Sequence, residues 1–131
     1  MAPTFNGISI AVADMATSLS FYRRLGLDFP AGAETEPHVE VELPGGVRLM
    51  WDTHASLLAF DPDWTVTAGG GPSLAFLCVD ADEVDKVYAD LEKAGHVTTK
   101  EPWDAPWGQR YALVQDPDGH QVDLFAWLKS S

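Results

Sequence analysis

The sequence is poor in cysteine and has no long apolar run. Its one cysteine, Cys78, excludes a disulfide within the chain; lying in an apolar run, it is expected to be a buried free thiol in a reducing cytoplasm. No apolar run approaches the roughly 20 residues that span a membrane. No basic segment precedes the first apolar stretch, as it would in a secretory signal. We therefore expect a cytoplasmic protein with no membrane partner.

Basic residues are also scarce. Lys and Arg number 8 against 20 Asp and Glu, which gives a net charge of -12. Nucleic-acid binding needs a basic surface, so the composition argues against nucleic acid as a partner. An acidic chain attracts cationic ligands over long range, but the same charge also serves solubility alone, and the composition leaves both interpretations open.

What the sequence does contain is enough apolar residues, 46% of 131, to bury the core of one globular domain. A strand is expected at Phe5–Val12, followed by a helix that Asp14 caps and Gly26 ends. The stretch His38–Leu43 alternates between apolar and polar residues, which is typical of a strand, and Val47–Trp51 forms the next strand. A short helix is expected within 52–63.

The second half repeats this order. A glycine-rich connector at 65–72 leads to a strand at Ser73–Val79, a helix capped by Asp80 or Asp82, and a strand near Val97–Lys100. Shifting the first half by 66 positions lays Asp14 on Asp80, Phe21 on Val87, Tyr22 on Tyr88 and Leu25 on Leu91. The repeat favours two copies of one strand–helix–strands module, at about 1–64 and 73–131, in a single α+β domain. The alternative is a chance similarity of two amphipathic helices.

A β-hairpin is the most readable element of the chain. The runs Gln109–Gln115 and His120–Trp127 flank Asp-Pro-Asp-Gly at 116–119, a turn built from residues that favour turn geometry. Along the second strand, one face is plain core and the other mixes aromatic rings with the carboxylate of Asp123. Trp103 and Trp107 lie just upstream on a loop stiffened by proline. Together these residues indicate a flat, apolar surface for a ligand.

The whole chain resembles the vicinal oxygen chelate superfamily, which includes glyoxalase I, extradiol dioxygenases and bleomycin resistance proteins. The segments that carry the resemblance are VADMATSLSFYRRLGL in the first module and VDADEVDKVYADLEKAG with LVQDPDGHQVDLF in the second. It implies two βαβββ modules whose curved sheets form a cup. The segments PHVEVELPGGVRLMWDT and PWDAPWGQRYALVQDPDG are most similar to the mitomycin resistance proteins within that group. This narrower resemblance implies a homodimer that binds a planar antibiotic in a groove built from both subunits.

Six residues are the candidate ligand contacts. By resemblance, Trp107 and Gly108 belong to the Pro-Trp-Gly segment that stacks on the drug, and His38 lies near the position of a second aromatic partner. That position is a departure, because histidine is smaller and can be polar. The sequence adds Trp51, Asp52 and Trp103. Trp51 faces the cup together with Met50 or points the opposite way. Asp52, Asp104 and Glu101 either orient a cationic ligand or are solvated carboxylates.

The metal site of the resembling enzymes is not expected here. Carried over by position, its four ligands would be Gly7 and Ser73 in the first strands and a residue near Met50 and Asp123 in the last strands. Only Asp123 is a plausible ligand, and catalytic sites use about three protein ligands. We therefore predict a binding protein without cofactor or turnover. The alternatives are a metal-dependent lyase or dioxygenase with ligands from unexpected positions, or an accessory binding protein of a biosynthetic pathway.

Overall fold

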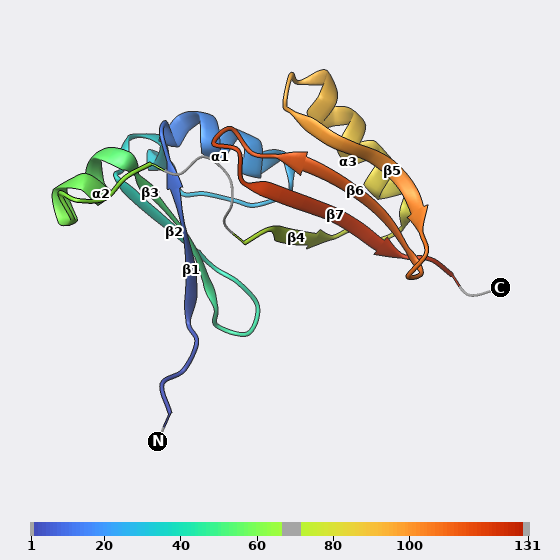
Figure 1. The fold of residues 1–131 in the computed structure, drawn as a ribbon, viewed down its shortest axis with the longest axis horizontal. Helices are drawn as coiled ribbons and strands as arrows, with labels where there is room; N and C mark the ends of the chain where they lie inside the picture. The colour runs from blue at the N-terminus through green and yellow to red at the C-terminus, as the bar shows by residue number, and fades with distance from the viewer. Residues whose placement is uncertain (1, 67–71, 130–131) are drawn as a thin grey trace. The chain divides into compact units, whose positions relative to one another are not determined.

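The computed structural model describes residues 2–66 and 72–129 of the chain. Within these ranges it is a mixed α+β structure with two mixed sheets, which confirms the fold class predicted from the sequence (Figure 1). The described residues divide into two compact units. The first takes in the residues up to Arg23 together with Leu27–Val66, and the second takes in Arg24–Gly26 and the residues after position 66.

The first half of the chain forms three strands, two α-helices and a short 3-10 helix in the described residues. In chain order they are β1 (Gly7–Val12), α1 (Met15–Arg24), η1 (Ala33–Thr35), β2 (His38–Glu42), β3 (Arg48–Thr53) and α2 (His54–Phe60). Strand β3 is central, with β1 parallel to it on one side and β2 antiparallel on the other. The short helix expected within 52–63 is thus present as α2.

The two faces of this sheet differ because alternate side chains of a strand point in opposite directions. One face is apolar and buried and carries Ile10, Val12, Val39, Leu49 and Trp51. Helix α1 adds the buried side chains of Met15, Leu19, Phe21 and Tyr22. Burying each such side chain contributes about 1.5–3 kcal/mol to stability. The opposite face carries polar side chains: Ser9, His38, Glu40, Arg48 and Asp52.

The second unit contains a complete strand–helix–three-strand module. Its elements are β4 (Leu74–Leu77), α3 (Ala81–Lys93), β5 (Thr98–Ala105), β6 (Gln109–Gln115) and β7 (Gln121–Trp127). The strand order is β4-β7-β6-β5, with β4 parallel to β7 and the other pairs antiparallel. Helix α3 packs on one face of this sheet (Figure 1). The buried residues there are Val84, Leu91, Ala112, Val114, Val122, Leu124 and Ala126.

Two helix caps stand 66 residues apart, as the internal repeat predicts. The carboxylate of Asp14 accepts a hydrogen bond of 2.9 Å from the backbone N–H of Thr17. The carboxylate of Asp80 accepts one of 2.9 Å from the backbone N–H of Glu83. Each cap satisfies one of the N–H groups that the first turn of a helix leaves without a partner. The predicted roles of Asp14 and Asp80 are therefore confirmed.

The turn between β6 and β7 is held by Asp116. Its Oδ1 accepts hydrogen bonds of 2.9 Å from the backbone N–H groups of Asp118 and His120. Gly119 has a φ of 85°, a conformation that costs glycine little. The hairpin register follows from this turn and pairs Gln115 with Gln121 and Tyr111 with Phe125.

Three details differ from the sequence-based expectation or fall outside it. In the first unit the segment 27–37 forms a loop with η1 among the described residues, as its residues favour, although the βαβββ module of the resemblance would place a strand there. Strand β5 continues to Ala105, so Trp103 lies on a strand and not on the expected loop. Most of the predicted connector at 65–72 lies outside the described residues. Across the described ranges, the helices are too short or too polar to cross a membrane.

Candidate ligand-binding site

An aromatic cluster lies on the sheet of the second unit. Register pairs Trp103 of β5 with Tyr111 of β6, and Tyr111 with Phe125 of β7. The three rings therefore form a row across three neighbouring strands, and their strand neighbours Ala112 and Leu124 point into the core on the other side. Two further tryptophans extend the row. We define the aromatic face as Trp103, Trp107, Tyr111, Phe125 and Trp127.

The rings of the aromatic face contact one another. The ring centre of Trp107 lies 5.8 Å from that of Trp103 and 5.5 Å from that of Tyr111, and both pairs are edge to face. Trp103 and Tyr111 are 5.9 Å apart, Tyr111 and Phe125 stack at 6.1 Å, and Phe125 meets Trp127 edge to face at 6.2 Å. Such arrangements are favoured by the ring quadrupoles. Trp107 and Trp127 nevertheless remain 55% and 65% exposed, so their surface is open to a ligand.

Trp107 is placed by a tight turn between β5 and β6. Gly108 adopts a φ of 88°, and its N–H donates to the carbonyl of Ala105 at 3.1 Å. The carbonyl of Gly108 in turn accepts from the N–H of Leu128 at 3.0 Å. The indole N–H of Trp107 donates to the side-chain oxygen of Gln109 at 2.9 Å. The role of Gly108 is therefore to form the turn that positions Trp107. The indole N–H of Trp107 already has a hydrogen-bond partner, so the ring is what this residue presents.

One face of Trp103 is covered by a cation. The Nζ atom of Lys100 lies 4.5 Å from the centre of the Trp103 ring. Such a contact is worth about 0.5–1 kcal/mol at an exposed site. Trp103 consequently offers less open ring surface to a ligand than Trp107 does. It also packs against the rings of Trp107 and Tyr111.

A buried carboxylate lies beside the aromatic row. Asp123 is 7% exposed, its Oδ2 accepts from the hydroxyl of Tyr111 at 2.5 Å, and its Oδ1 accepts from the amide of Gln121 at 2.9 Å. Burial, together with the bond to Asp123, raises the pKa of Tyr111 to about 12. The phenol therefore stays protonated and donates its hydrogen over the whole physiological pH range.

The first unit carries a polar network on its open sheet face. His38 Nδ1 lies 2.6 Å from Asp52 Oδ1, and His38 Nε2 lies 3.0 Å from Glu40 Oε2. Asp52 also accepts from the hydroxyl of Ser9 at 2.5 Å, and Glu40 also accepts from Arg48 at 2.9 Å. The hydrogen bonds to Glu40 and then to Asp52 raise the pKa of His38. The imidazole therefore favours its charged form between two carboxylates.

Trp51 points into the core and not toward this polar face. It is fully buried, and its ring meets Tyr22 at 5.3 Å and Phe29 at 5.0 Å, both edge to face. Met50, the preceding residue on β3, points to the opposite face. The side chain of Trp51 therefore packs in the core of the first unit and has no exposed surface among the described residues.

The structure therefore brings the candidate residues together in two groups. Trp103, Trp107 and Gly108 cluster in the second unit, while His38 and Asp52 are joined in the first. Sequence reasoning missed Tyr111 as the ring that connects the aromatic face. The role of Tyr111 can be predicted from the register of the hairpin. Counting back from the turn places Tyr111 opposite Phe125 and diagonally beside Asp123.

The positions at which the resembling enzymes hold a metal do not fit a divalent ion. In the first unit, a Cβ atom at Gly7 would lie 2.7 Å from the terminal methyl of Met50, so the thioether fills the space beside the glycine. In the second unit, Ser73 is exposed and both oxygens of Asp123 hold protein donors. Within the described residues, no three His, Cys, Asp or Glu side chains are grouped to hold a metal ion.

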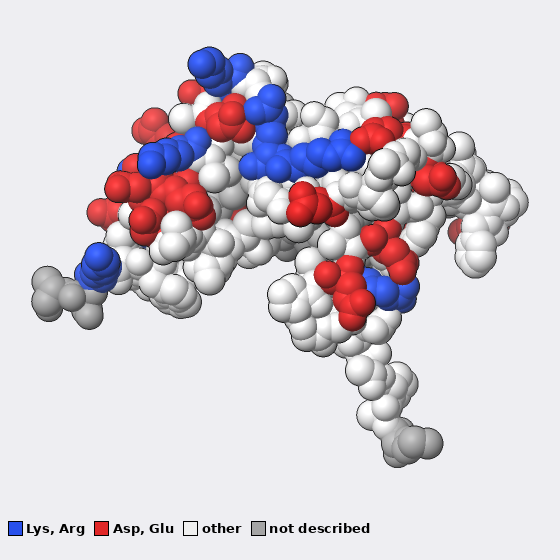
Figure 2. All heavy atoms as spheres, turned by 180° about the vertical axis from the view of Figure 1, so that it is seen from behind, with Lys and Arg blue, Asp and Glu red and all other residues white. Residues whose placement is uncertain are grey.

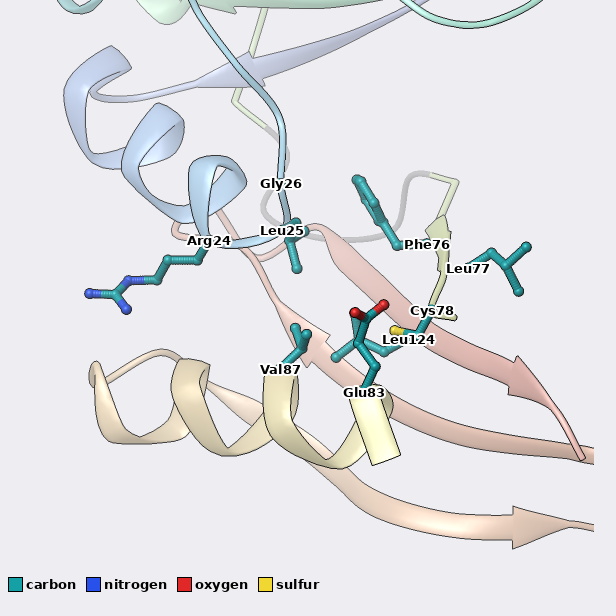
Figure 3. A pocket seen from close by; sticks show the side chains of 9 residues that line it. All are labelled: Arg24, Leu25, Gly26, Phe76, Leu77, Cys78, Glu83, Val87 and Leu124. Carbon is teal, nitrogen blue, oxygen red and sulfur yellow. The ribbon is translucent and has the colours of Figure 1, made fainter. Parts of the chain in front are cut away.

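A separate cavity of about 230 Å³ lies in the second unit (Figure 3). Its lining residues are Arg24, Leu25, Gly26, Phe76, Leu77, Cys78, Glu83, Val87 and Leu124. Burial, with smaller contributions from nearby Glu83 and Asp80, raises the pKa of the Cys78 thiol to about 11, so the thiol is a poor nucleophile. Arg24 points away from the cavity and pairs with Asp90 at 3.0 Å. This chemistry gives no reason to place a reaction there.

Acidic side chains gather on the second unit near its C-terminal end, at the left of Figure 2. In the same unit the start of α3 carries Asp80, Asp82 and Glu83. Asp85 and Asp104 both pair with Arg110, at 3.0 and 3.1 Å, so their charge is partly balanced. Such a surface raises the local concentration of cations over that of anions.

Comparisons with known proteins agree on one family. A family model described as the glyoxalase/bleomycin resistance protein/dioxygenase superfamily matches residues 4–124. A search of curated proteins finds no match to this chain.

Solved structures share the fold at low sequence identity. A glyoxalase-related enzyme from Fulvimarina pelagi is 22% identical with a TM-score of 0.79, covering 95% of this chain and 88% of its own. A glyoxalase/bleomycin resistance protein/dioxygenase from Nocardioides is 23% identical with a TM-score of 0.73, covering 100% and 87%. TioX from Micromonospora sp. ML1 is 22% identical with a TM-score of 0.61, covering 96% and 100%. These likenesses show a common fold.

Proposed function

Because the chain belongs to the glyoxalase/bleomycin resistance protein/dioxygenase superfamily, we propose that it captures a planar aromatic ligand on the aromatic face without converting it. The observation that carries the proposal is the open ring surface of Trp107 and Trp127, on the face of the sheet opposite the buried residues Ala112 and Leu124. Indole rings are electron-rich on their faces, so electron-poor heteroaromatic or quinone rings are the preferred partners.

The energetics of such a site permit useful affinity. Stacking on an indole contributes about 0.5–1.5 kcal/mol beyond area burial. Removing about 200 Å² of apolar ligand surface from water contributes roughly 5 kcal/mol. Association entropy and side-chain ordering offset part of this gain. Binding in the micromolar range therefore needs no covalent step.

The donor set supports capture over conversion. The reactions of the resembling enzymes use a divalent metal as a Lewis acid. Gly7, Met50 and Ser73 offer no suitable ligand here, and Asp123 is engaged with Tyr111 and Gln121. The similarity of the Pro-Trp-Gly segment to mitomycin resistance proteins supports the narrower proposal that the ligand is a planar antibiotic. The same similarity supports a homodimer whose groove is built from both subunits, with His38 and Asp52 contributing polar contacts.

Fluorescence titration tests this function. The panel contains mitomycins, bleomycins and other flat antibiotics, and the signal is tryptophan emission. We expect saturable quenching by at least one compound, and about tenfold or more weaker binding by Trp107→Ala. Phe60→Ala is the matched control, because Phe60 is a 91% exposed aromatic residue of α2 in the first unit. The proposal fails if no compound binds, or if Trp107→Ala and Phe60→Ala both bind like the wild type.

A further inference from the structure

Asp123 occupies an unusual place for a carboxylate. It is 7% exposed, and it stands on β7 between Gln121 and Phe125 on the side of the sheet that carries the aromatic face. A buried carboxylate is costly unless its oxygens are hydrogen-bonded. Both oxygens are: Oδ2 by the hydroxyl of Tyr111 at 2.5 Å and Oδ1 by the amide of Gln121 at 2.9 Å. Among the ion pairs of the described residues, none involves Asp123, so these neutral donors provide its stabilisation.

The partner that Asp123 holds is the central ring of the aromatic face. Tyr111 contacts Trp107 at 5.5 Å, Trp103 at 5.9 Å and Phe125 at 6.1 Å. It thereby links Trp103 on β5 and Trp107 after it with Phe125 on β7. A rotation of the Tyr111 ring would change all three contacts, whereas the hydrogen bond to Asp123 fixes the position of the ring through its hydroxyl.

We propose that Asp123 is a positioning residue of the ligand-binding site: by holding the Tyr111 hydroxyl it fixes the aromatic face in the geometry that receives a planar ligand. The carboxylate, at a position where the resembling enzymes place a metal ligand, serves here to order aromatic rings. A divalent ion at this place would compete with Tyr111 and Gln121 for the carboxylate oxygens. This inference rests on the proposed function for its effect on binding, but the ordering of the rings is independent of it.

A double-mutant cycle between Asp123 and Tyr111 tests the inference. Asp123→Ala and Tyr111→Phe are each expected to weaken binding of a flat ligand about tenfold. The double variant is expected to bind no more weakly than the poorer single variant, because both remove one interaction. Asp123→Asn keeps an acceptor oxygen and is expected to stay within about threefold of the wild type. Glu92→Ala, an exposed carboxylate of α3, is the matched control and is expected to change nothing.

Near-ultraviolet circular dichroism gives a readout that does not need a ligand. We expect the aromatic signal to fall in Asp123→Ala and Tyr111→Phe and to be retained in Asp123→Asn and Glu92→Ala. If Asp123→Ala does not fold, the aromatic dichroism of Tyr111→Phe and of Asp123→Asn is compared with that of Glu92→Ala instead. The inference is overturned if the dichroism and affinity of Asp123→Ala and Tyr111→Phe match those of Glu92→Ala, or if the two single effects add in the double variant.

A metal arm separates this role from ion binding. Addition of Mn²⁺ or Zn²⁺ to the wild type is expected to leave the dichroism and the ligand affinity unchanged. A metal-dependent change that disappears in Asp123→Ala would overturn the inference, since it would make Asp123 a metal ligand. If no flat compound binds the wild type, the proposed function fails, and the dichroism of the variants still decides whether Asp123 orders the rings.

Discussion

His38 and Asp52 face each other as register partners on β2 and β3, and their side chains meet with 2.6 Å between Nδ1 and Oδ1. Glu40 closes the other side of the imidazole at 3.0 Å. In its charged form the imidazole donates one N–H to each of the two carboxylates on an open sheet face. The protonation of His38 therefore depends on its carboxylate partners, Glu40 on β2 and Asp52 on β3.

The first prediction concerns the pKa of His38. Since hydrogen bonds to Glu40 and Asp52 raise this pKa above its ordinary value of 6.5, we expect NMR titration of the imidazole to give a midpoint above 6.5. Asp52→Asn is expected to lower the midpoint, and Ser9→Ala, which keeps the carboxylate, is expected to change it less. A midpoint at or below 6.5 in the wild type would contradict the network.

The same network sets a pH window for stability. A raised histidine pKa stabilises the fold below pH 6.5, and this contribution is lost as the pH rises through the folded pKa. The pKa of Glu40 is lowered from 4.5, chiefly by its bond to His38, so its contribution is present above pH 4.5 and lost as the pH falls. The difference in unfolding free energy between the wild type and His38→Gln, measured with urea, should therefore be largest between about pH 4.5 and 6.5.

The second prediction concerns Trp51. Because the ring is fully buried against Tyr22 and Phe29, Trp51→Ala should cost about 3–5 kcal/mol of unfolding free energy. Trp51→Phe should cost less, since the indole N–H has no partner among the described residues and its loss removes an unsatisfied donor. Trp127→Ala, at a 65% exposed site, is the control for losing a tryptophan. Equal stabilities of Trp51→Ala and Trp127→Ala in urea would refute the core placement.

The third prediction concerns the cap of α3. Asp80→Ala removes the acceptor of the Glu83 N–H and should cost about 1 kcal/mol. Asp80→Asn keeps an acceptor and should retain most of that stability. Asp82→Ala removes a carboxylate from the same first turn without removing the cap, so its cost should be smaller. If thermal or urea unfolding ranks Asp82→Ala as the more damaging change, the cap assignment is wrong.

The fourth prediction concerns the phenol of Tyr111. With its pKa raised to about 12, Tyr111 should ionise well above the ordinary tyrosine pKa of 10 in an alkaline absorbance titration. The folded state then binds a proton that the unfolded state has released, so stability should fall as the pH rises from about 10 to 12. Tyr111→Phe should remove this part of the titration. Loss of a phase near pH 10 in that variant would contradict the buried hydrogen bond.

The sequence predicts the elements well where the local chemistry is strong. Asp14 and Asp80 cap their helices, and the Asp-Pro-Asp-Gly turn sets the hairpin register. Prediction from the sequence fails where one residue pattern is compatible with two arrangements of the side chains. Trp51 and Met50 are neighbours on one strand, and alternation alone cannot say which of them faces the core; packing against Tyr22 and Phe29 decides it.

The site shows the same limit. The aromatic residues near 103–107 indicate a ligand surface, but strand β5 extends through Trp103, because pairing with Tyr111 outweighs the local preference for a loop. The importance of Tyr111 depends on contacts across three strands, which no single stretch of sequence contains. The polar network around His38 likewise joins residues 14 positions apart in sequence.

The central claim is that the aromatic face captures a ligand and leaves it chemically unchanged. The most direct measurement is calorimetric titration of a flat antibiotic that quenches tryptophan emission, followed by mass spectrometry of the ligand recovered after incubation with and without Mn²⁺, Fe²⁺, Ni²⁺ or Zn²⁺. The account predicts saturable binding that Trp107→Ala weakens and recovery of intact ligand under every condition. A product that forms with metal and disappears on chelation would contradict it.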